Sequence, residues 1–144
     1  MATAVDVIVI GTGSAAQSVA YKVREAGWSV AVVDSRPFGG TCQLRGCDPK
    51  KVLVGVSELV DWSHRMQGKG VSAPALSINW PNLVRFKRTF TDPAPHENEQ
   101  AYMQAGILTK HGRALFVDRT TVEVAGDRLV GRYVVIAGGA RHAR

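Results

Sequence analysis

Residues 5–16, VDVIVIGTGSAA, decide the fold of this chain. The first half is short, apolar and rich in β-branched residues, which predicts a buried parallel strand. The glycines that follow predict a tight turn into an amphipathic helix that ends near Gly27. A second apolar run from Ser29 to Val33 then predicts another strand, and this strand ends at Asp34.

This strand, turn, helix and strand form a βαβ unit with a dinucleotide-binding fingerprint in which Ala replaces the last glycine. Gly11 makes the tight turn, and Gly13 lets the backbone approach a pyrophosphate at the helix N-terminus. Asp34 lies 21 residues after Gly13, where an acidic residue binds ribose hydroxyls. The predicted cofactor contacts of this unit are Gly11, Gly13, Ser14, Ala15, Asp34 and Ser35. The unit itself does not choose between NAD and FAD.

The stretch GGTCQLRGCDPKK, residues 39–51, holds the two cysteines of the chain. Five residues of regular helix advance about 7.5 Å. A disulfide tolerates Cα separations of up to about 6.8 Å. If Cys42 and Cys47 pair, the backbone between them therefore cannot be an undistorted helix, and Gly46 relieves that constraint.

Cys47 is predicted to lie at the N-terminus of a helix, because Pro49 suits a first helical turn. The helix dipole and the ammonium groups of Lys50 and Lys51 favour a thiolate there and lower a thiol pKa. The alternative is a pair of reduced, half-buried cysteines. The flanking glycines and lysines favour redox chemistry at a dithiol.

The order of these two features resembles that of the pyridine nucleotide–disulfide oxidoreductases, the group of glutathione reductase, dihydrolipoamide dehydrogenase and mercuric reductase. The resemblance covers essentially the whole chain, as the N-terminal FAD-binding part of such an enzyme. It implies an α/β, Rossmann-like domain with a parallel sheet. It also implies a parent enzyme that passes electrons from NAD(P)H through FAD to a Cys42–Cys47 disulfide. A disulfide or a thiophilic metal ion would then be the substrate.

By this resemblance Cys47 is the flavin-proximal, charge-transfer thiol and Cys42 is the interchange thiol that attacks the substrate. Lys50 would approach flavin N5 as part of the catalytic group. Further cofactor contacts implied by the resemblance are Gly40, Thr41, Arg113, Ala114, Gly138 and Gly139. Gly138 stands where the family usually has Thr, and Arg45 and Asp48 replace residues that are commonly apolar.

The length of 144 residues predicts a single, partial FAD/NAD(P)-binding domain. A second Gly-rich fingerprint and a dimer-interface domain are not apparent in the sequence, so we expect a fragment of a longer, homodimeric parent enzyme. We expect that enzyme to act in cell redox homeostasis in the cytoplasm, because a catalytic thiol pair fits a reducing compartment. The apolar runs are too short to predict a membrane helix.

The remaining chain predicts supporting structure. Helices are expected over Trp80–Phe90 and Glu97–Ala105. Short β runs over Arg113–Val117, Thr121–Val124 and Arg128–Val130 predict a small inserted antiparallel meander. A separate returning strand is then expected over Tyr133–Ile136.

The net charge of +6 raises the question of nucleic-acid binding. The densest basic cluster is residues 85–88, where Phe86 is predicted to belong to the core stripe of a helix with a solvated charged face. The histidines show no metal-ligand spacing, so no metal site is predicted. Two alternatives stay open: a non-catalytic flavin- or nucleotide-binding module, and a thiol metal-binding protein.

Overall fold

A six-stranded mixed sheet lies at the centre of the computed structural model, which describes residues 2–72 and 76–140. The strand order is β3-β2-β1-β6-β5-β4. The parallel part consists of β1 (Ala2–Ile10), β2 (Val30–Asp34), β3 (Leu108–His111) and β6 (Asp127–Ile136). The antiparallel part adds β4 (Leu115–Phe116) and β5 (Thr121–Val124) to the edge of β6. This arrangement confirms the predicted α/β, Rossmann-like fold.

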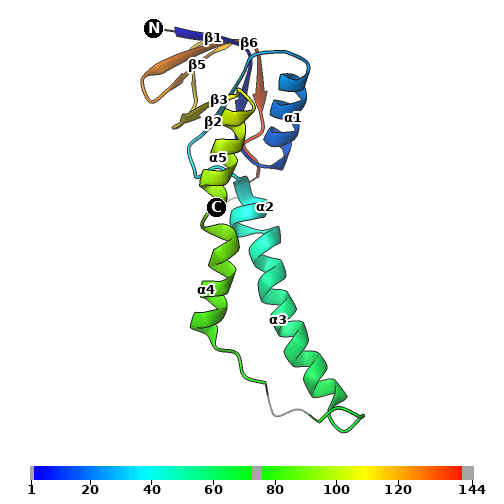
Figure 1. The fold of residues 1–144 in the computed structure, drawn as a ribbon. Helices are drawn as coiled ribbons and strands as arrows, with labels where there is room; N and C mark the ends of the chain where they lie inside the picture. Colours follow the sequence, from blue (N-terminus) through cyan, green and yellow to red (C-terminus); the bar gives the residue numbers. More distant parts are fainter. Residues whose placement is uncertain (1, 73–75, 141–144) are drawn as a thin grey trace.

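The described ranges contain five helices: α1 (Ser14–Glu25), α2 (Gly40–Arg45), α3 (Cys47–Met66), α4 (Trp80–Thr91) and α5 (Ala94–Gln104). The first connects β1 to β2, as expected for a βαβ unit. α3 and α4 run side by side away from the sheet, and α5 leads the chain back to β3 (Figure 1). None of these helices is both long and apolar enough to cross a membrane.

Each face of the sheet carries its own apolar core, because successive side chains of a strand point to opposite faces. On one face Val7 and Val9 of β1 pack with Ala16 and Ala20 of α1 and with Tyr102 of α5. The opposite face buries a second cluster consisting of Ile8, Ala31, Val33, Val122, Val124 and Leu129. Both cores lie within the sheet region, which makes that region the rigid base for the strand ends.

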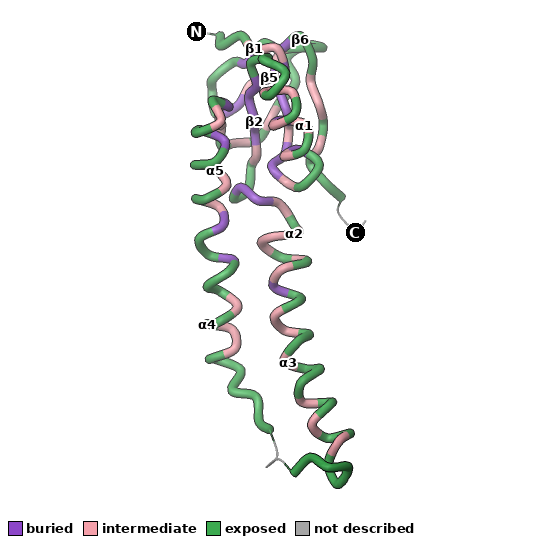
Figure 2. The backbone as a smooth tube through the Cα atoms, turned by 45° about the vertical axis from the view of Figure 1, so that its right-hand side comes forward, coloured by how far each residue is buried: buried purple, intermediate pink, exposed green. Residues whose placement is uncertain are grey.

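The pair formed by α3 and α4 is mostly exposed along its length (Figure 2). Pro49 is the one buried residue of α3. Leu59 of α3 is 61% exposed and Phe86 of α4 is 55% exposed. The prediction that Phe86 belongs to a core stripe is therefore wrong. Its ring instead makes a T-shaped contact with Phe90, with the two ring centroids 5.2 Å apart.

The antiparallel region differs in detail from the prediction. Arg128–Val130 and Tyr133–Ile136 are parts of the single strand β6, because Gly131 continues it and donates its N–H to the Thr120 carbonyl at 2.9 Å. A Cβ at Gly131 would lie 3.1 Å from the Ile8 side chain, so the glycine lets the strands pack closely. The meander is thus an extension of the main sheet.

One further strand and one helix boundary also differ from the sequence prediction. The strand β3 was not predicted, although it forms the parallel edge beside β2. α5 begins at Ala94, three residues before the predicted start at Glu97, because Pro93 and Pro95 fit the first turn of a helix.

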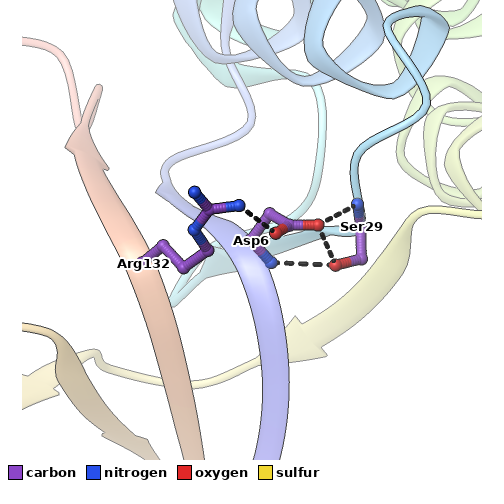
Figure 3. Close-up of polar contacts among 3 residues, drawn as sticks. All are labelled: Asp6, Ser29 and Arg132. Carbon is purple, nitrogen blue, oxygen red and sulfur yellow. Dashed lines mark hydrogen bonds and ion pairs between the residues drawn. The ribbon is translucent and has the colours of Figure 1, made fainter.

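A polar cluster of Asp6, Ser29 and Arg132 ties the middle of β1 to the start of β2 and to β6 (Figure 3). Asp6 Oδ2 accepts hydrogen bonds from the Ser29 backbone N–H at 2.9 Å and from the Ser29 hydroxyl at 2.7 Å. Arg132 Nη1 lies 3.2 Å from Asp6 Oδ1. Hydrogen bonds from Ser29, with a smaller effect of Arg132, lower the pKa of Asp6.

Candidate functional site

A cavity of about 760 Å³ opens at the carboxyl ends of β1, β2 and β6. In open α/β sheets this is the edge at which ligands bind. The turn after β3 also reaches it, because the Gly112 N–H donates to the Asp34 carbonyl at 2.9 Å. The lining includes residues 10–15, 33–37, 40–42, 45–47, 112–114 and 137–140. Its volume falls within the range of roughly 300–1,000 Å³ found for small-molecule and cofactor sites.

The turn between β1 and α1 requires glycine at its first position. Gly11 has φ +113°, and a Cβ there would collide with the Ala137 carbonyl oxygen. Gly13 is the N-cap residue of α1 and supplies no side-chain cap. The first N–H groups of α1 therefore have no intrahelical acceptor, and the positive end of the helix dipole faces the cavity. An anion such as a pyrophosphate fits this position.

Asp34 is held by two hydrogen bonds at the end of β2. Its Oδ1 accepts from the Arg36 backbone N–H at 3.0 Å, and its Oδ2 accepts from the Thr12 hydroxyl at 2.7 Å. Each carboxylate oxygen can accept a further hydrogen bond, so the group can still bind hydroxyls. Thr12 is fully buried and was not predicted as a functional residue. Its partner is 22 residues away, and local sequence carries no signal of that contact.

The two cysteines lie on consecutive helices. Cys42 belongs to α2 and Cys47 begins α3, with Gly46 between the helices at φ −122° and ψ −105°. The helix is thus interrupted where the spacing argument requires it. A Cβ at Gly46 would lie 3.0 Å from the Thr41 carbonyl oxygen, so the close approach of the two segments depends on glycine. Both cysteines are free thiols, with Cys42 half-buried and Cys47 exposed.

The two thiols interact with each other. A hydrogen bond with Cys47 is the main cause that raises the pKa of Cys42, and desolvation adds to it. The Cys42 thiol therefore keeps its proton to higher pH than an ordinary cysteine.

The charged lining of the cavity is mostly positive. Arg36, Arg45 and Arg113 contribute guanidinium groups, against the single carboxylate of Asp34. Arginine suits phosphate oxygens because its planar group donates paired hydrogen bonds. Arg36 and Arg45 were not predicted as ligands. The position of Arg36, two residues after the acid that ends β2, is a signal that could have identified it.

The structure brings nearly all the predicted site residues to this one cavity. Those that line it are Gly11, Gly13, Ser14, Ala15, Asp34, Ser35, Gly40, Thr41, Cys42, Cys47, Arg113, Ala114, Gly138 and Gly139. Lys50 does not line it; this residue is exposed on the first turn of α3. In the described part of the chain no group of three or more His, Cys, Asp or Glu side chains could hold a metal ion.

Gly40 joins the two halves of the site. It has φ +68°, and a Cβ there would collide with the Cα of Gly13. The start of α2 therefore packs directly on the Gly-rich turn, backbone against backbone. The N-terminus of α1, the arginines, the carboxylate and the volume together fit a dinucleotide, and the two cysteines line the same cavity.

Comparison with known proteins agrees with this geometry. The chain is 31% identical to a glutathione reductase from Nostoc over an alignment of 140 positions, which covers 94% of this chain and 30% of that protein. It is 32% identical to a mercuric reductase from Lysinibacillus sphaericus over an alignment of 141 positions, which covers 94% of this chain and 25% of that protein. A dihydrolipoyl dehydrogenase from Mycoplasma pneumoniae is 31% identical over 137 residues, again 94% and 30%.

The chain thus spans less than a third of the length of these relatives. Residues 5–144 match the sequence profile of the family described as pyridine nucleotide-disulphide oxidoreductase. That match includes both the Gly-rich turn and the dithiol segment. The chain belongs to the pyridine nucleotide-disulphide oxidoreductase family.

Proposed function

We propose that this chain binds FAD in the cavity at the strand ends and holds Cys42 and Cys47 as a redox-active pair beside it. The observation that carries the proposal is that both thiols and the Gly-rich turn line one cavity of about 760 Å³. The bound flavin would supply two-electron transfer between a nicotinamide nucleotide and the dithiol. We infer that residues 1–144 act as a single, partial domain of a longer enzyme.

Different residues of the chain would bind different parts of the cofactor. The N-terminus of α1, from Gly13 to Ala15, would bind the pyrophosphate, with Gly11 shaping the turn. Asp34 and Ser35 would bind ribose hydroxyls at the end of β2. Arg113 and Ala114 would contact the adenine side. Gly40, Thr41, Gly138 and Gly139 would approach the flavin side, and Lys50 would need to turn toward the cavity to take part.

The two thiols would have different tasks. By the family resemblance, Cys47 would be the thiol that faces the flavin. Cys42 would then be the interchange thiol that attacks the substrate. Reduction of the Cys42–Cys47 disulfide would add two electrons and two protons and leave two thiols.

The parent enzyme would transfer electrons from NAD(P)H to a small-molecule or protein disulfide, or to a thiophilic metal ion. The names of its relatives, glutathione reductase, dihydrolipoyl dehydrogenase and mercuric reductase, support a substrate of this class. We propose that it is homodimeric and cytoplasmic. The chain would bind neither nucleic acid nor a membrane.

FAD binding tests the proposal directly. The wild-type chain is titrated into FAD and the quenching of flavin fluorescence is followed. Asp34→Ala removes the carboxylate and is expected to weaken binding about tenfold, or about 1.4 kcal/mol. Asp61→Ala, on the exposed side of α3, is the matched control and should bind as the wild type does. No quenching by a folded wild-type chain would refute the cofactor assignment, and equal binding by Asp34→Ala would refute the role of that residue.

A further inference from the structure

Three amide side chains from three helices form a continuous hydrogen-bonded chain beside the dithiol. Gln17 Nε2 on α1 donates to Asn98 Oδ1 on α5 at 2.8 Å. Asn98 Nδ2 in turn donates to Gln43 Oε1 on α2 at 2.7 Å. All three groups are partly buried, and the two contacts span 81 and 55 residues of sequence. We call Gln17, Asn98 and Gln43 the amide relay.

The direction of the amide relay is fixed at its centre. Asn98 Nδ2 also donates to the Ala94 carbonyl at 2.6 Å. A carbonyl can only accept, so the NH₂ group of Asn98 must face this side and its oxygen must face Gln17. Asn98 thereby satisfies donors and acceptors on three helices with one side chain.

α2 has few other anchors. It has six residues, none of them buried, and its N-cap residue Gly39 makes no side-chain capping bond. Within the described ranges, the α2 side chains in a hydrogen bond are Gln43, which accepts from Asn98 of α5, and Cys42, which bonds with Cys47. A cavity of about 250 Å³ is lined by Gln43 of α2, by Asn98 of α5 and by residues of α3 and α4. The amide contact therefore joins α2 to α5 beside a space that apolar packing does not fill.

The amide relay also touches the backbone that leads into α2. A Cβ at Gly39 would lie 2.9 Å from Gln43 Oε1 and 3.2 Å from Asn98 Nδ2, so the two amides pack tightly against that residue. Gln43 follows Cys42 directly in the chain. Holding Gln43 in place thus restrains the backbone that carries the Cys42 thiol.

We propose that Asn98 is a positioning residue for the dithiol. Through its hydrogen bond to Gln43, Asn98 sets the distance of Cys42 from Cys47. This inference rests on the proposed redox function of the two thiols. A restrained Cys42 has a high effective concentration toward Cys47, because less conformational freedom is lost when the S–S bond forms. Removing the restraint should make the disulfide easier to reduce.

The experiment measures the equilibrium between dithiol and disulfide in glutathione buffers. Forming one Cys42–Cys47 bond oxidises both thiols, while one glutathione disulfide is reduced to two glutathione thiols. Samples are quenched with an alkylating reagent, and the free thiols are counted by mass spectrometry. The readout is a reduction potential, which needs neither FAD nor turnover.

Asn98→Ala and Gln43→Ala are each expected to lower the equilibrium constant for disulfide formation by about threefold to tenfold. That change moves the potential by about 15–30 mV toward less negative values. The double variant should lose little more than either single variant, because both remove the same contact. Gln100→Ala, exposed on the same helix α5, is the matched control and should leave the potential unchanged.

Circular dichroism establishes whether each variant is folded. If Asn98→Ala does not fold, the potential of Gln43→Ala decides the test. Wild-type potentials in both relay variants, or fully additive effects in the double variant, would overturn the positioning role. A wild-type chain whose two thiols stay free in every buffer would overturn the dithiol function itself, and the positioning role with it.

Discussion

The Thr12 hydroxyl donates a hydrogen bond to Asp34 Oδ2 at 2.7 Å, and its oxygen accepts one from the Gly39 backbone N–H at 3.3 Å. One buried side chain therefore joins the Gly-rich turn, the end of β2 and the residue that precedes α2. The two hydrogen bonds restrain both the Asp34 carboxylate and the backbone that leads to Cys42.

Thr12→Val replaces this hydroxyl with a methyl group of similar size. The change leaves the partly buried Asp34 Oδ2 and the buried Gly39 N–H without this partner, which should lower the free energy of unfolding by about 1–3 kcal/mol. Urea denaturation measures the loss. Thr12→Ser retains the hydroxyl and should be clearly more stable than Thr12→Val. Equal stability of Thr12→Val and the wild type would contradict this role.

Alanine substitutions at Gly11 and at Gly13 are predicted to have different effects, the first on stability and the second on FAD binding. Gly11→Ala should lower the free energy of unfolding by about 2 kcal/mol or more, because its positive φ and the Ala137 carbonyl both oppose a Cβ. Gly13 has φ −77°, and its Cβ would lie at an ordinary 3.7 Å from Gly40 Cα. Gly13→Ala should therefore fold normally.

The methyl group of Gly13→Ala would instead stand where the pyrophosphate approaches the backbone. We expect FAD affinity to fall by about tenfold or more while the unfolding free energy changes by less than about 0.5 kcal/mol. Fluorescence titration and denaturation of the same sample separate the two effects. Unimpaired FAD binding by Gly13→Ala would place the pyrophosphate elsewhere.

Most of the parallel core could be predicted from sequence because its signals are local. The apolar run of β1, the glycines of the turn and the acid at the end of β2 lie within residues 5–34. The interruption at Gly46 followed from the reach of a disulfide against the rise of a helix. The cavity then gathered these elements because parallel strands end at one edge.

The features missed by sequence analysis depend on contacts between distant segments. β3 has the mixed sequence Leu-Thr-Lys-His and is stabilised as a strand by pairing with β2 along one side. Thr12 and Asn98 are ordinary polar residues whose partners lie tens of residues away. Phe86 has helical spacing typical of a core residue, yet α4 projects away from the sheet core.

Asp6 should make stability depend on acid pH. Its folded-state pKa lies below the usual value of 3.8, so its contribution is fully present above the unfolded pKa and is lost as pH falls through the folded one. Asp6→Asn should therefore flatten the decline in unfolding free energy below about pH 4. Denaturant midpoints of Asp6→Asn and the wild type, taken at a series of acidic pH values, measure this decline. Asp118 and Asp127 also have lowered pKa values and would keep part of the slope. An unchanged slope in Asp6→Asn would contradict the prediction.

Tyr102 buries a hydroxyl that has no hydrogen-bond partner among the described residues. Desolvation raises its pKa strongly, so the group stays neutral. Its ring stacks on Tyr21 at 5.3 Å, and phenylalanine would keep that packing. Tyr102→Phe should leave the free energy of unfolding unchanged or raise it by up to about 1 kcal/mol. A loss of more than about 1 kcal/mol would reveal a bound partner for the hydroxyl.

If the two thiols face a flavin bound in the shared cavity, their redox state should change the absorption of that flavin. The most direct test is the absorption spectrum of the FAD-loaded, desalted protein, recorded with the Cys42–Cys47 pair oxidised and again with it reduced. We expect the protein to retain flavin near a one-to-one ratio and to show new long-wavelength absorption when the dithiol is reduced. Cys47→Ser should lack that absorption. Identical spectra in the two states, or the same absorption surviving in Cys47→Ser, would contradict this expectation.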